Sequence, residues 1–136
     1  MDGHPFSVEI VTPTEQKFSG EVTIVTLPGV QGEMGILAGH APLLAMLDPG
    51  EVKYRNSQGE FHIAVGEGFA TVAGNKVVCL VDFALEPSEI SVETARLDAD
   101  RIEKELEDER RPEALDRLRQ ELKIARAKVK VGDRQQ

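Results

Sequence analysis

Three histidines and one cysteine are the side chains in this sequence best suited to binding a metal ion. A zinc site needs several Cys, His or carboxylate ligands at characteristic short spacings. His4, His40 and His62 are scattered along the chain, and Cys79 has no second cysteine to accompany it. We therefore expect no metal site.

The glycines of Gly66-Glu67-Gly68 begin like a dinucleotide-binding fingerprint, but Thr71 stands where the third glycine is needed. That fingerprint opens a helix, whereas this one falls between two expected strands. The sequence contains no Gly-Lys pair for a phosphate-binding loop and no Gly-x-Ser-x-Gly nucleophile turn. We therefore predict a protein that acts by binding or coupling, with no catalytic residues and no cofactor. A stand-alone enzyme is the weaker alternative.

Residues 27–44 combine the composition of a loop with that of a buried segment. The stretch holds four glycines and two prolines, and glycine allows backbone conformations and close approaches that other residues do not. It also holds Met34, Ile36 and Leu44, which need burial or a partner. Two interpretations stay open: an ordered loop that plugs one end of the fold, or a contact surface for another protein.

Charge is unevenly distributed over the 136 residues, whose formal net charge is −8. From Glu109 onward there are nine Lys or Arg against five Asp or Glu, a net +4, so the preceding part carries −12. A nucleic-acid-binding domain usually shows basic residues over much of its surface, and we expect no such partner here. The basic end is either a solvated helix face or a surface for an acidic partner.

The lone Cys79 excludes an internal disulfide framework, and its apolar neighbours predict that it is buried. The first residues lack the basic and apolar segments of a signal peptide. No apolar run reaches the roughly 20 residues that a membrane-spanning helix needs. We therefore expect contact with a membrane only through partner proteins.

Composition changes near Pro87: eleven of the twelve glycines and most β-branched residues precede it. In the first part, apolar and polar residues alternate in short runs, which is the pattern of half-buried strands. The run 77–81 is apolar on both faces and is expected to be the most buried strand. This pattern predicts a β-sandwich or flattened barrel. The expected strands cover residues 6–10, 22–27, 52–55, 61–65, 69–72 and 77–81, with turns at 56–59 and 73–76.

The second part predicts two helices joined by a short link at residues 108–111. Apolar residues recur every three or four positions in each, which gives each helix one narrow apolar stripe. Ser91 is suited to cap the first helix, and Pro112 suits the first turn of the second. The stripes consist of Val92, Ala95, Ala99, Ile102 and Leu106, and of Leu115, Leu118, Leu122, Ala125 and Val129.

An antiparallel hairpin of two such helices is marginally stable alone, because it buries little apolar area. It needs the β-domain or another protein to cover its remaining apolar surface. A hairpin near balance between docked and undocked states can act as a switch. A hairpin packed permanently on the β-domain is the alternative.

An ordered set of motifs resembles the epsilon subunits of F-type ATP synthase over nearly the whole chain. The most specific lie in the glycine-rich segment, and the others follow the family's order. They are Phe18-Ser19-Gly20, Gly32-Glu33-Met34-Gly35-Ile36-Leu37, Gly39-His40-Ala41-Pro42-Leu43-Leu44, Gly66-Glu67-Gly68-Phe69, Asn75-Lys76-Val77, Leu80-Val81-Asp82 and Glu89-Ile90.

The resemblance implies a ten-stranded β-sandwich in residues 1–87 and a regulatory helical hairpin in residues 88–136. It also implies a non-catalytic rotor subunit, which binds the gamma subunit and the ring of c subunits and couples them during ATP synthesis. Gly32, Glu33 and His40 would be its rotor contacts. The protein would lie peripherally on the cytoplasmic face of the energy-transducing inner or plasma membrane.

In bacterial relatives the hairpin can extend into the catalytic head and inhibit ATP hydrolysis. Basic residues of the second helix would then meet acidic segments of the alpha and beta subunits. Each exposed ion pair contributes only about 0–1 kcal/mol, but several together can bias a shallow balance. The candidate contacts are Arg117, Arg119, Lys123, Arg126, Lys128 and Lys130.

Some relatives bind ATP through a motif, Ile/Leu-Asp-x-x-Arg-Ala, at the start of the first helix. Here Ser91 replaces the Asp and Thr94 replaces the Arg, which removes a fixed cation suited to phosphate. Arg126 and Lys130 remain near the family's basic positions on the second helix. We therefore predict weak or absent ATP binding by the isolated subunit. A nucleotide-sensing module in which ATP controls hairpin docking is the alternative function.

Overall fold

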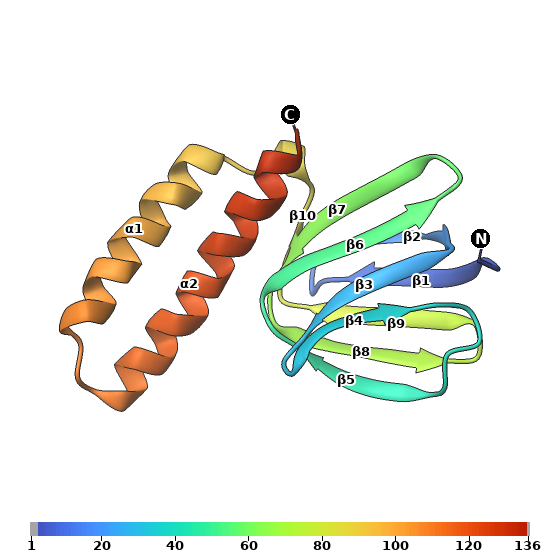
Figure 1. Cartoon of the computed structure of the whole chain (residues 1–136), viewed down its shortest axis with the longest axis horizontal. Coiled ribbons are helices and arrows are strands. Elements are labelled where there is room, and N and C mark those ends of the chain that lie inside the picture. The colour runs from blue at the N-terminus through green and yellow to red at the C-terminus, as the bar shows by residue number, and fades with distance from the viewer. Residues whose placement is uncertain (1–2, 136) are drawn as a thin grey trace.

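The computed structural model describes residues 3–135 and consists of a β-sandwich with a helical hairpin against one side (Figure 1). The expected ten-stranded sandwich followed by an antiparallel two-helix hairpin is confirmed. No helix in the described part of the chain is long and apolar enough to cross a membrane. The strands are β1 (Phe6–Val11), β2 (Gln16–Val22), β3 (Ile24–Gly29), β4 (Gly32–Ile36), β5 (Leu43–Leu47), β6 (Gly50–Asn56), β7 (Gly59–Val65), β8 (Gly68–Ala73), β9 (Lys76–Val81) and β10 (Ala84–Leu85).

All ten strands belong to one hydrogen-bonded sheet that folds over on itself. Its order is β10-β7-β6-β3-β5-β8-β9-β1-β2, and β4 pairs with β3 off this path. Neighbours pair antiparallel, except that β1 runs parallel to β9. Near the ends of the path, Phe18 of β2 stacks on Tyr54 of β6 with ring centroids 4.2 Å apart, so the two layers close around one core.

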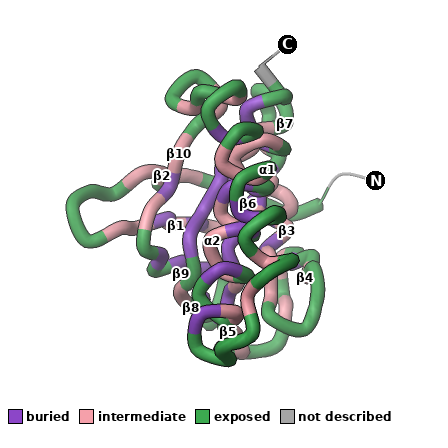
Figure 2. The backbone as a smooth tube through the Cα atoms, turned by 90° about the vertical axis from the view of Figure 1, so that its left-hand side faces the viewer, coloured by how far each residue is buried: buried purple, intermediate pink, exposed green. Residues whose placement is uncertain are grey.

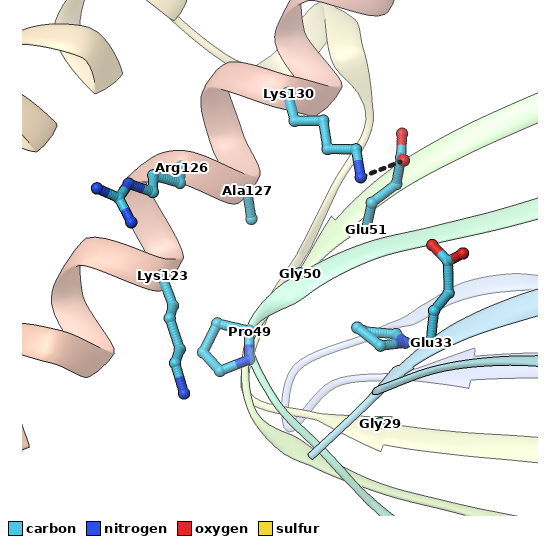
Figure 3. Close-up of a pocket in the computed structure, with 10 residues that line it drawn as sticks. Gly29, Glu33, Pro49, Gly50, Glu51, Lys123, Arg126, Ala127 and Lys130 are labelled. Carbon is cyan, nitrogen blue, oxygen red and sulfur yellow. Dashed lines mark ion pairs between the residues drawn. The ribbon is translucent and has the colours of Figure 1, made fainter. Parts of the chain in front are cut away.

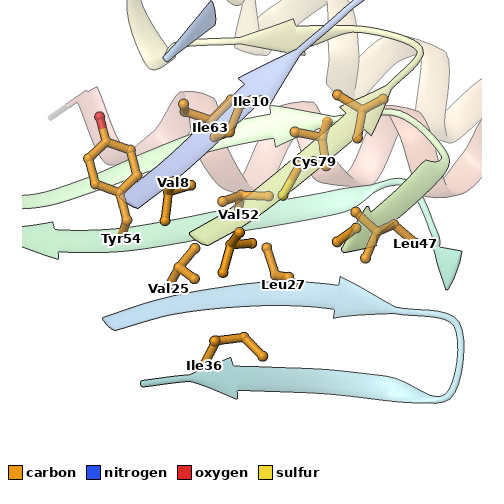
Figure 4. Close-up of a cluster of buried hydrophobic side chains, with 14 of the residues drawn as sticks. Val8, Ile10, Val25, Leu27, Ile36, Leu47, Val52, Tyr54, Ile63 and Cys79 are labelled. Carbon is orange, nitrogen blue, oxygen red and sulfur yellow. The ribbon is translucent and has the colours of Figure 1, made fainter. Parts of the chain in front are cut away.

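Alternation along the strands builds that core from branched aliphatic side chains (Figure 4). In β1, Phe6, Val8 and Ile10 point inward and are at most 3% exposed. The same period of two buries Val52 and Tyr54 of β6, whose register partners on β7 are Ile63 and Phe61. Burial of each such residue removes apolar surface from water, and this removal is the main favourable contribution to folding. Cys79 is fully buried in this core, as expected.

The two predicted turns at 56–59 and 73–76 are confirmed, since each joins two paired antiparallel strands. Each contains a glycine in a backbone conformation that is unfavourable for other residues. Gly59 has φ +134° and begins β7, and Gly74 has φ +60° in the turn between β8 and β9. Both turns are short enough to fix the register of the antiparallel pairs that they join.

The helices begin where their capping residues predict. Ser91 accepts a hydrogen bond from the Thr94 amide and starts α1 (Val92–Asp108), and Pro112 is the first residue of α2 (Pro112–Gly132). Short 3₁₀ turns flank them, η1 (Pro87–Glu89) before α1 and η2 (Asp133–Gln135) after α2. Both predicted stripes meet between the helices, where Ile102, Leu118, Leu122 and Ala125 are buried. Figure 2 shows the buried segments in purple along the strands and exposed segments in green at the turns.

Three expectations about the strands are corrected. Residues 22–27 are not one strand, because the chain bends at Thr23: Val22 ends β2, and β3 continues through Pro28 to Gly29. Residues 77–81 are not the most buried strand, since Leu80 is 39% exposed on the outer face of β9. The glycine-rich segment is not mainly a loop, because it holds the end of β3, all of β4 and the start of β5.

Candidate functional site at the junction of hairpin and sandwich

The hairpin contacts the sandwich through α2, which lies between α1 and the outer face of β6 and β7 (Figure 1). In these strands the residues between the core positions point outward, so Glu51 of β6 and its register partner Ala64 of β7 lie beneath the helix. Both are buried, Ala64 fully. A small residue at position 64 is what allows a helix to approach the sheet closely.

The apolar part of this junction is small. Ala127 and Val131 of α2 pack on Ala64, with Leu85 and Ile90 partly buried beside them. These α2 residues are separate from the stripe that faces α1, so α2 has two apolar faces. Only one face was predicted from the sequence, because Ala127 and Val131 supply just two positions of the second face.

Charged contacts surround this apolar contact. Lys123 Nζ lies 3.0 Å from Asp48 Oδ2 in the turn between β5 and β6. Lys130 Nζ lies 3.5 Å from Glu51 Oε1, and Lys128 lies over the ring of Phe83 at 5.5 Å. The ion pair between Lys130 and Glu51 is drawn in Figure 3.

Five of the six predicted head-contacting residues have acidic partners within the described part of the chain, and the sixth, Lys128, lies over the ring of Phe83. Besides Lys123 and Lys130, Arg126 contacts Glu103 of α1 at 2.6 Å. Two others pair within α2: Arg117 with Glu121 at 3.6 Å and Arg119 with Asp116 at 3.7 Å. The structure brings Lys123, Arg126 and Lys130 together along one side of α2.

A groove of about 320 Å³ runs between these cations and the sandwich (Figure 3). Its other wall includes Pro28, Pro49, Glu51 and Glu33. Glu33, predicted as a rotor contact, thus lies beside the hairpin on the exposed start of β4.

The three predicted rotor contacts are not gathered at one point. Gly32 and Glu33 begin β4 next to the β3–β4 turn, whereas His40 follows the opposite end of that strand. A strand rises about 3.3 Å per residue, so the five residues of β4 separate the two positions by more than about 10 Å. The His40 ring lies 2.7 Å from the carbonyl oxygen of Ala41, to which Nδ1 donates.

Glu51 is the central residue that was not predicted from the sequence, and besides Lys130 it has two hydrogen-bonding partners, His62 and Arg134. His62 Nδ1 donates to its Oε2 at 2.8 Å, and Arg134 donates from Nε at 3.1 Å and from Nη2 at 3.2 Å. Burial alone would raise the pKa of Glu51, but the hydrogen bonds and charges of Arg134 and His62 outweigh it and lower the pKa. Alternation around Val52 and Tyr54 was the one available signal, since it places Glu51 on the outer face.

The residues of the altered nucleotide motif have another role here. Ser91 Oγ accepts from the Thr94 amide at 3.3 Å and donates to Thr94 Oγ1 at 3.0 Å. The Ser91 side chain thus caps α1, and the Thr94 hydroxyl is hydrogen-bonded to it. Among the described residues, no three Cys, His, Asp or Glu side chains converge as a metal site would require.

The family model described as "ATP synthase, Delta/Epsilon chain, beta-sandwich domain" matches residues 5–87. An ATP synthase epsilon chain from Lawsonia intracellularis is 41% identical over 99 residues, covering 73% of this chain and 74% of the relative. That of Halalkalibacterium halodurans is 38% identical over 120 residues, covering 88% and 90%.

Two solved assemblies contain chains of similar fold. One chain of the Euglena gracilis mitochondrial ATP synthase (OSCP/F1/c-ring) matches with TM-score 0.80 at 21% identity, covering 93% of this chain and 82% of that one. A chain of the Tetrahymena thermophila mitochondrial ATP synthase central stalk and c-ring matches with TM-score 0.52 at 18% identity, covering 65% and 72%. At these identities the likeness concerns the fold. The family model and the curated relatives, however, cover most of the sequence, and the chain belongs to the epsilon chains of ATP synthase.

Proposed function

We propose that this protein is a non-catalytic subunit of the ATP synthase central stalk that couples the c-subunit ring to the gamma subunit during ion-driven ATP synthesis. It acts without a cofactor, on the cytoplasmic face of the energy-transducing membrane, which it reaches only through its partners. The family supports this proposal, as do the two similar folds, which come from assemblies described as F1/c-ring and central stalk/c-ring.

The outer face of β5, β8 and β9 is the proposed surface for gamma. Met46, Phe69 and Leu80 are register neighbours across these three strands, and all three are exposed. Leu44, two residues before Met46, is 66% exposed on the same face. A continuous apolar patch on a protein surface usually marks a place where a partner binds. We call Leu44, Met46, Phe69 and Leu80 the apolar patch.

The predicted rotor contacts Gly32, Glu33 and His40 are distributed along the edge strand β4 and the loop that follows it. In the described part of the chain β4 pairs only with β3, so its other edge is free of strand partners. We propose that a rotor partner lies along this edge, contacting Gly32 and Glu33 at one end and the His40 loop at the other.

The hairpin, residues 88–136, is the proposed regulatory part, and residues 1–87 are the coupling part. One observation carries this proposal: α2 is held on the sandwich by two small apolar contacts and by ion pairs. Few contacts therefore separate the docked from the undocked state: the apolar contact is small, the Lys123–Asp48 pair is exposed and contributes little, and Glu51 alone pairs a buried carboxylate with the hairpin. On undocking, Lys123 and Lys130 exchange their partners in the sandwich for acidic segments of the catalytic subunits, with Arg117, Arg119 and Arg126 beside them.

Nucleotide control of docking is the second candidate function. The groove offers three cations, Lys123, Arg126 and Lys130, to an anionic ligand, but Glu33 and Glu51 also line it. The use of Ser91 as the cap of α1, with Thr94 as its partner, opposes a dedicated ATP site. We expect the isolated subunit to bind ATP weakly or not at all. Saturation at sub-millimolar ATP in calorimetry would reverse the ranking of the two candidates.

ATP hydrolysis by the reconstituted catalytic head tests the regulatory proposal. The full chain is compared with a chain truncated after Pro87, with and without added ATP, after both are shown to bind gamma. Higher hydrolysis with the truncated chain is the expected result. Equal hydrolysis would leave the hairpin a structural element and the protein a coupling subunit only.

A further inference from the structure

Glu51 is an unusual residue for the place it occupies. It is the one charged residue classed as buried among those whose burial is described, and its side chain is only 5% exposed. A buried carboxylate is costly unless cations and hydrogen-bond donors surround it. The identity and position of those partners therefore decide which conformation of the chain Glu51 favours.

Two of these three partners come from the base of the hairpin, at the C-terminal end of α2 and in η2. Arg134 of η2 approaches with two nitrogens, one to each carboxylate oxygen, which is the strongest geometry for an arginine–carboxylate pair. Lys130, in the last turn of α2, adds a second cation at 3.5 Å. Only His62 of β7 belongs to the sandwich itself.

Undocking of α2 would remove both cations at once. Glu51 would keep His62, whose Nε2 also lies 3.7 Å from the Glu60 carboxylate. Two acidic groups would then share one imidazole, with Arg134 and Lys130 gone. Water would have to solvate the Glu51 carboxylate in their place, so the energy of undocking is concentrated at this residue.

The other junction contacts are weaker by the same reasoning. Lys123 and Asp48 form a pair whose side chains are 46% and 28% exposed, and water screens such a pair well. Ala127 and Val131 bury few carbon atoms. Neither contact leaves an unpaired buried charge when it opens.

We propose that Glu51 and Arg134 form an electrostatic latch that holds the hairpin docked, so that disruption of this one pair releases α2 while the sandwich stays folded. The latch joins β6 to residues beyond the end of α2. Salt weakens it in part, because the Arg134 side chain is 41% exposed, although the buried Glu51 carboxylate is screened much less than a surface charge. The latch rests on the proposed function in one respect, namely that release of the hairpin is the regulatory step.

Thiol labelling of the isolated full-length chain tests the latch without the rest of the ATP synthase. Ala127, on the side of α2 that faces the sandwich, is 5% exposed and becomes accessible only when the helix undocks, so Ala127→Cys places a reporter at the junction. Native Cys79 is the internal control: it is fully buried in the sandwich, and burial raises its pKa to about 12. A maleimide fluorophore then reports undocking at position 127 and global unfolding at Cys79.

Arg134→Gln in the Ala127→Cys background is the decisive variant, and Arg101→Gln is its matched control. Arg101 is also an exposed arginine of the hairpin with acidic partners, but both of these, Asp98 and Glu105, lie on α1. We expect Arg134→Gln to raise the labelling rate at position 127 by about 10-fold. This factor corresponds to the weaker end of the range for hydrogen bonds to charged groups, which we expect because Arg134 is partly exposed. Labelling of Cys79 stays unchanged.

Salt and a double variant sharpen the result. Raising the salt from about 0.05 M to about 1 M should speed labelling of the chain that keeps Arg134, and have much less effect with Arg134→Gln. Glu51→Gln together with Arg134→Gln should label less than the product of the single effects predicts, as for coupled residues. If Glu51→Gln exposes Cys79, the Arg134→Gln result decides alone. Labelling of Arg134→Gln within twofold of Arg101→Gln would overturn the latch, whatever the hydrolysis assay shows.

Discussion

Gly132, the last residue of α2, lies against Val92, the first residue of α1, with no room for a β-carbon between them. A Cβ at position 132 would overlap Cγ2 of Val92 and would lie 3.0 Å from Cγ2 of Ile90. Both neighbours are β-branched and stiff, so neither side chain can turn away easily. The base of the hairpin therefore depends on this glycine.

Gly132→Ala should destabilise the docked hairpin by about 1 kcal/mol. Overpacking costs about 1–3 kcal/mol, and the better helix propensity of alanine returns up to about 1 kcal/mol. Labelling of Ala127→Cys measures the change. Val92→Ala in the same chain removes the obstructing methyl groups and should restore slower labelling. Equal labelling with and without Gly132→Ala would mean that the helices adjust without cost.

Gly68→Ala should destabilise the sandwich by about 3 kcal/mol or more, since the new methyl group would overlap the Leu80 carbonyl oxygen in the paired strand β9. Backbone cannot rotate aside as a side chain can. Gly35→Ala is the control, because nothing lies within 4 Å of a Cβ there. Urea unfolding measures both, and similar losses for the two variants would contradict this account.

Acid should undock the hairpin through Glu51. The docked-state pKa of this carboxyl is lowered, so its contribution is complete above the ordinary value of 4.5 and is lost as the pH falls through the lowered pKa. NMR of α2 and β7 resonances between neutral and acid pH measures the docked fraction. The pKa values of Glu89 and Glu109 are lowered as well, and they titrate in the same direction. Comparison with Glu51→Gln isolates the contribution of Glu51 to the pH dependence of docking. Identical pH profiles for the two chains would show that Glu51 makes no such contribution.

Met46→Glu should weaken binding to gamma by about 10-fold or more while leaving the fold intact. A charge in the centre of an apolar contact must be desolvated on binding, but Met46 is 58% exposed in the free chain. Leu97→Glu is the matched control, because Leu97 is 65% exposed on α1, far from the apolar patch in sequence and on another element. Equal affinities of the two variants for gamma would place the gamma contact elsewhere.

Local signals predicted the hairpin well and the strands only in part. Ser91 and Pro112 fix helix starts because a cap and a missing amide act within one turn of the chain. The break at Thr23 reflects the pairing of β3 with the distant strand β6, which no local signal reveals. Strand β4 pairs with its neighbour β3, but it was missed because its sequence contains two glycines and it is mostly exposed, so it lacks the alternating apolar pattern of a half-buried strand. Leu80 illustrates the same limit, since the sequence cannot tell a strand buried on both faces from one with an exposed apolar face.

The candidate site was less predictable for the same reason. Lys123 and Lys130 were identified from their charge and helical position, but their present partners, Asp48 and Glu51, lie more than seventy positions earlier. Arg134 and Glu51 are 83 positions apart. An ion pair of this kind appears only when the whole fold is assembled.

The parallel pairing of β1 with β9 determines when the sandwich can form during synthesis on the ribosome. Strand β1 can pair with β2 as soon as both emerge, but its other edge has no partner until residues 76–81 are made. Strand β1 therefore lacks its second partner during most of the translation of the sandwich, and its core side chains stay exposed to water in that time. Such non-local pairing slows folding and prolongs exposure to aggregation. Because α2 packs on β6 and β7, the hairpin can dock only after these strands have formed, and it is the last part of the nascent chain to reach its final position.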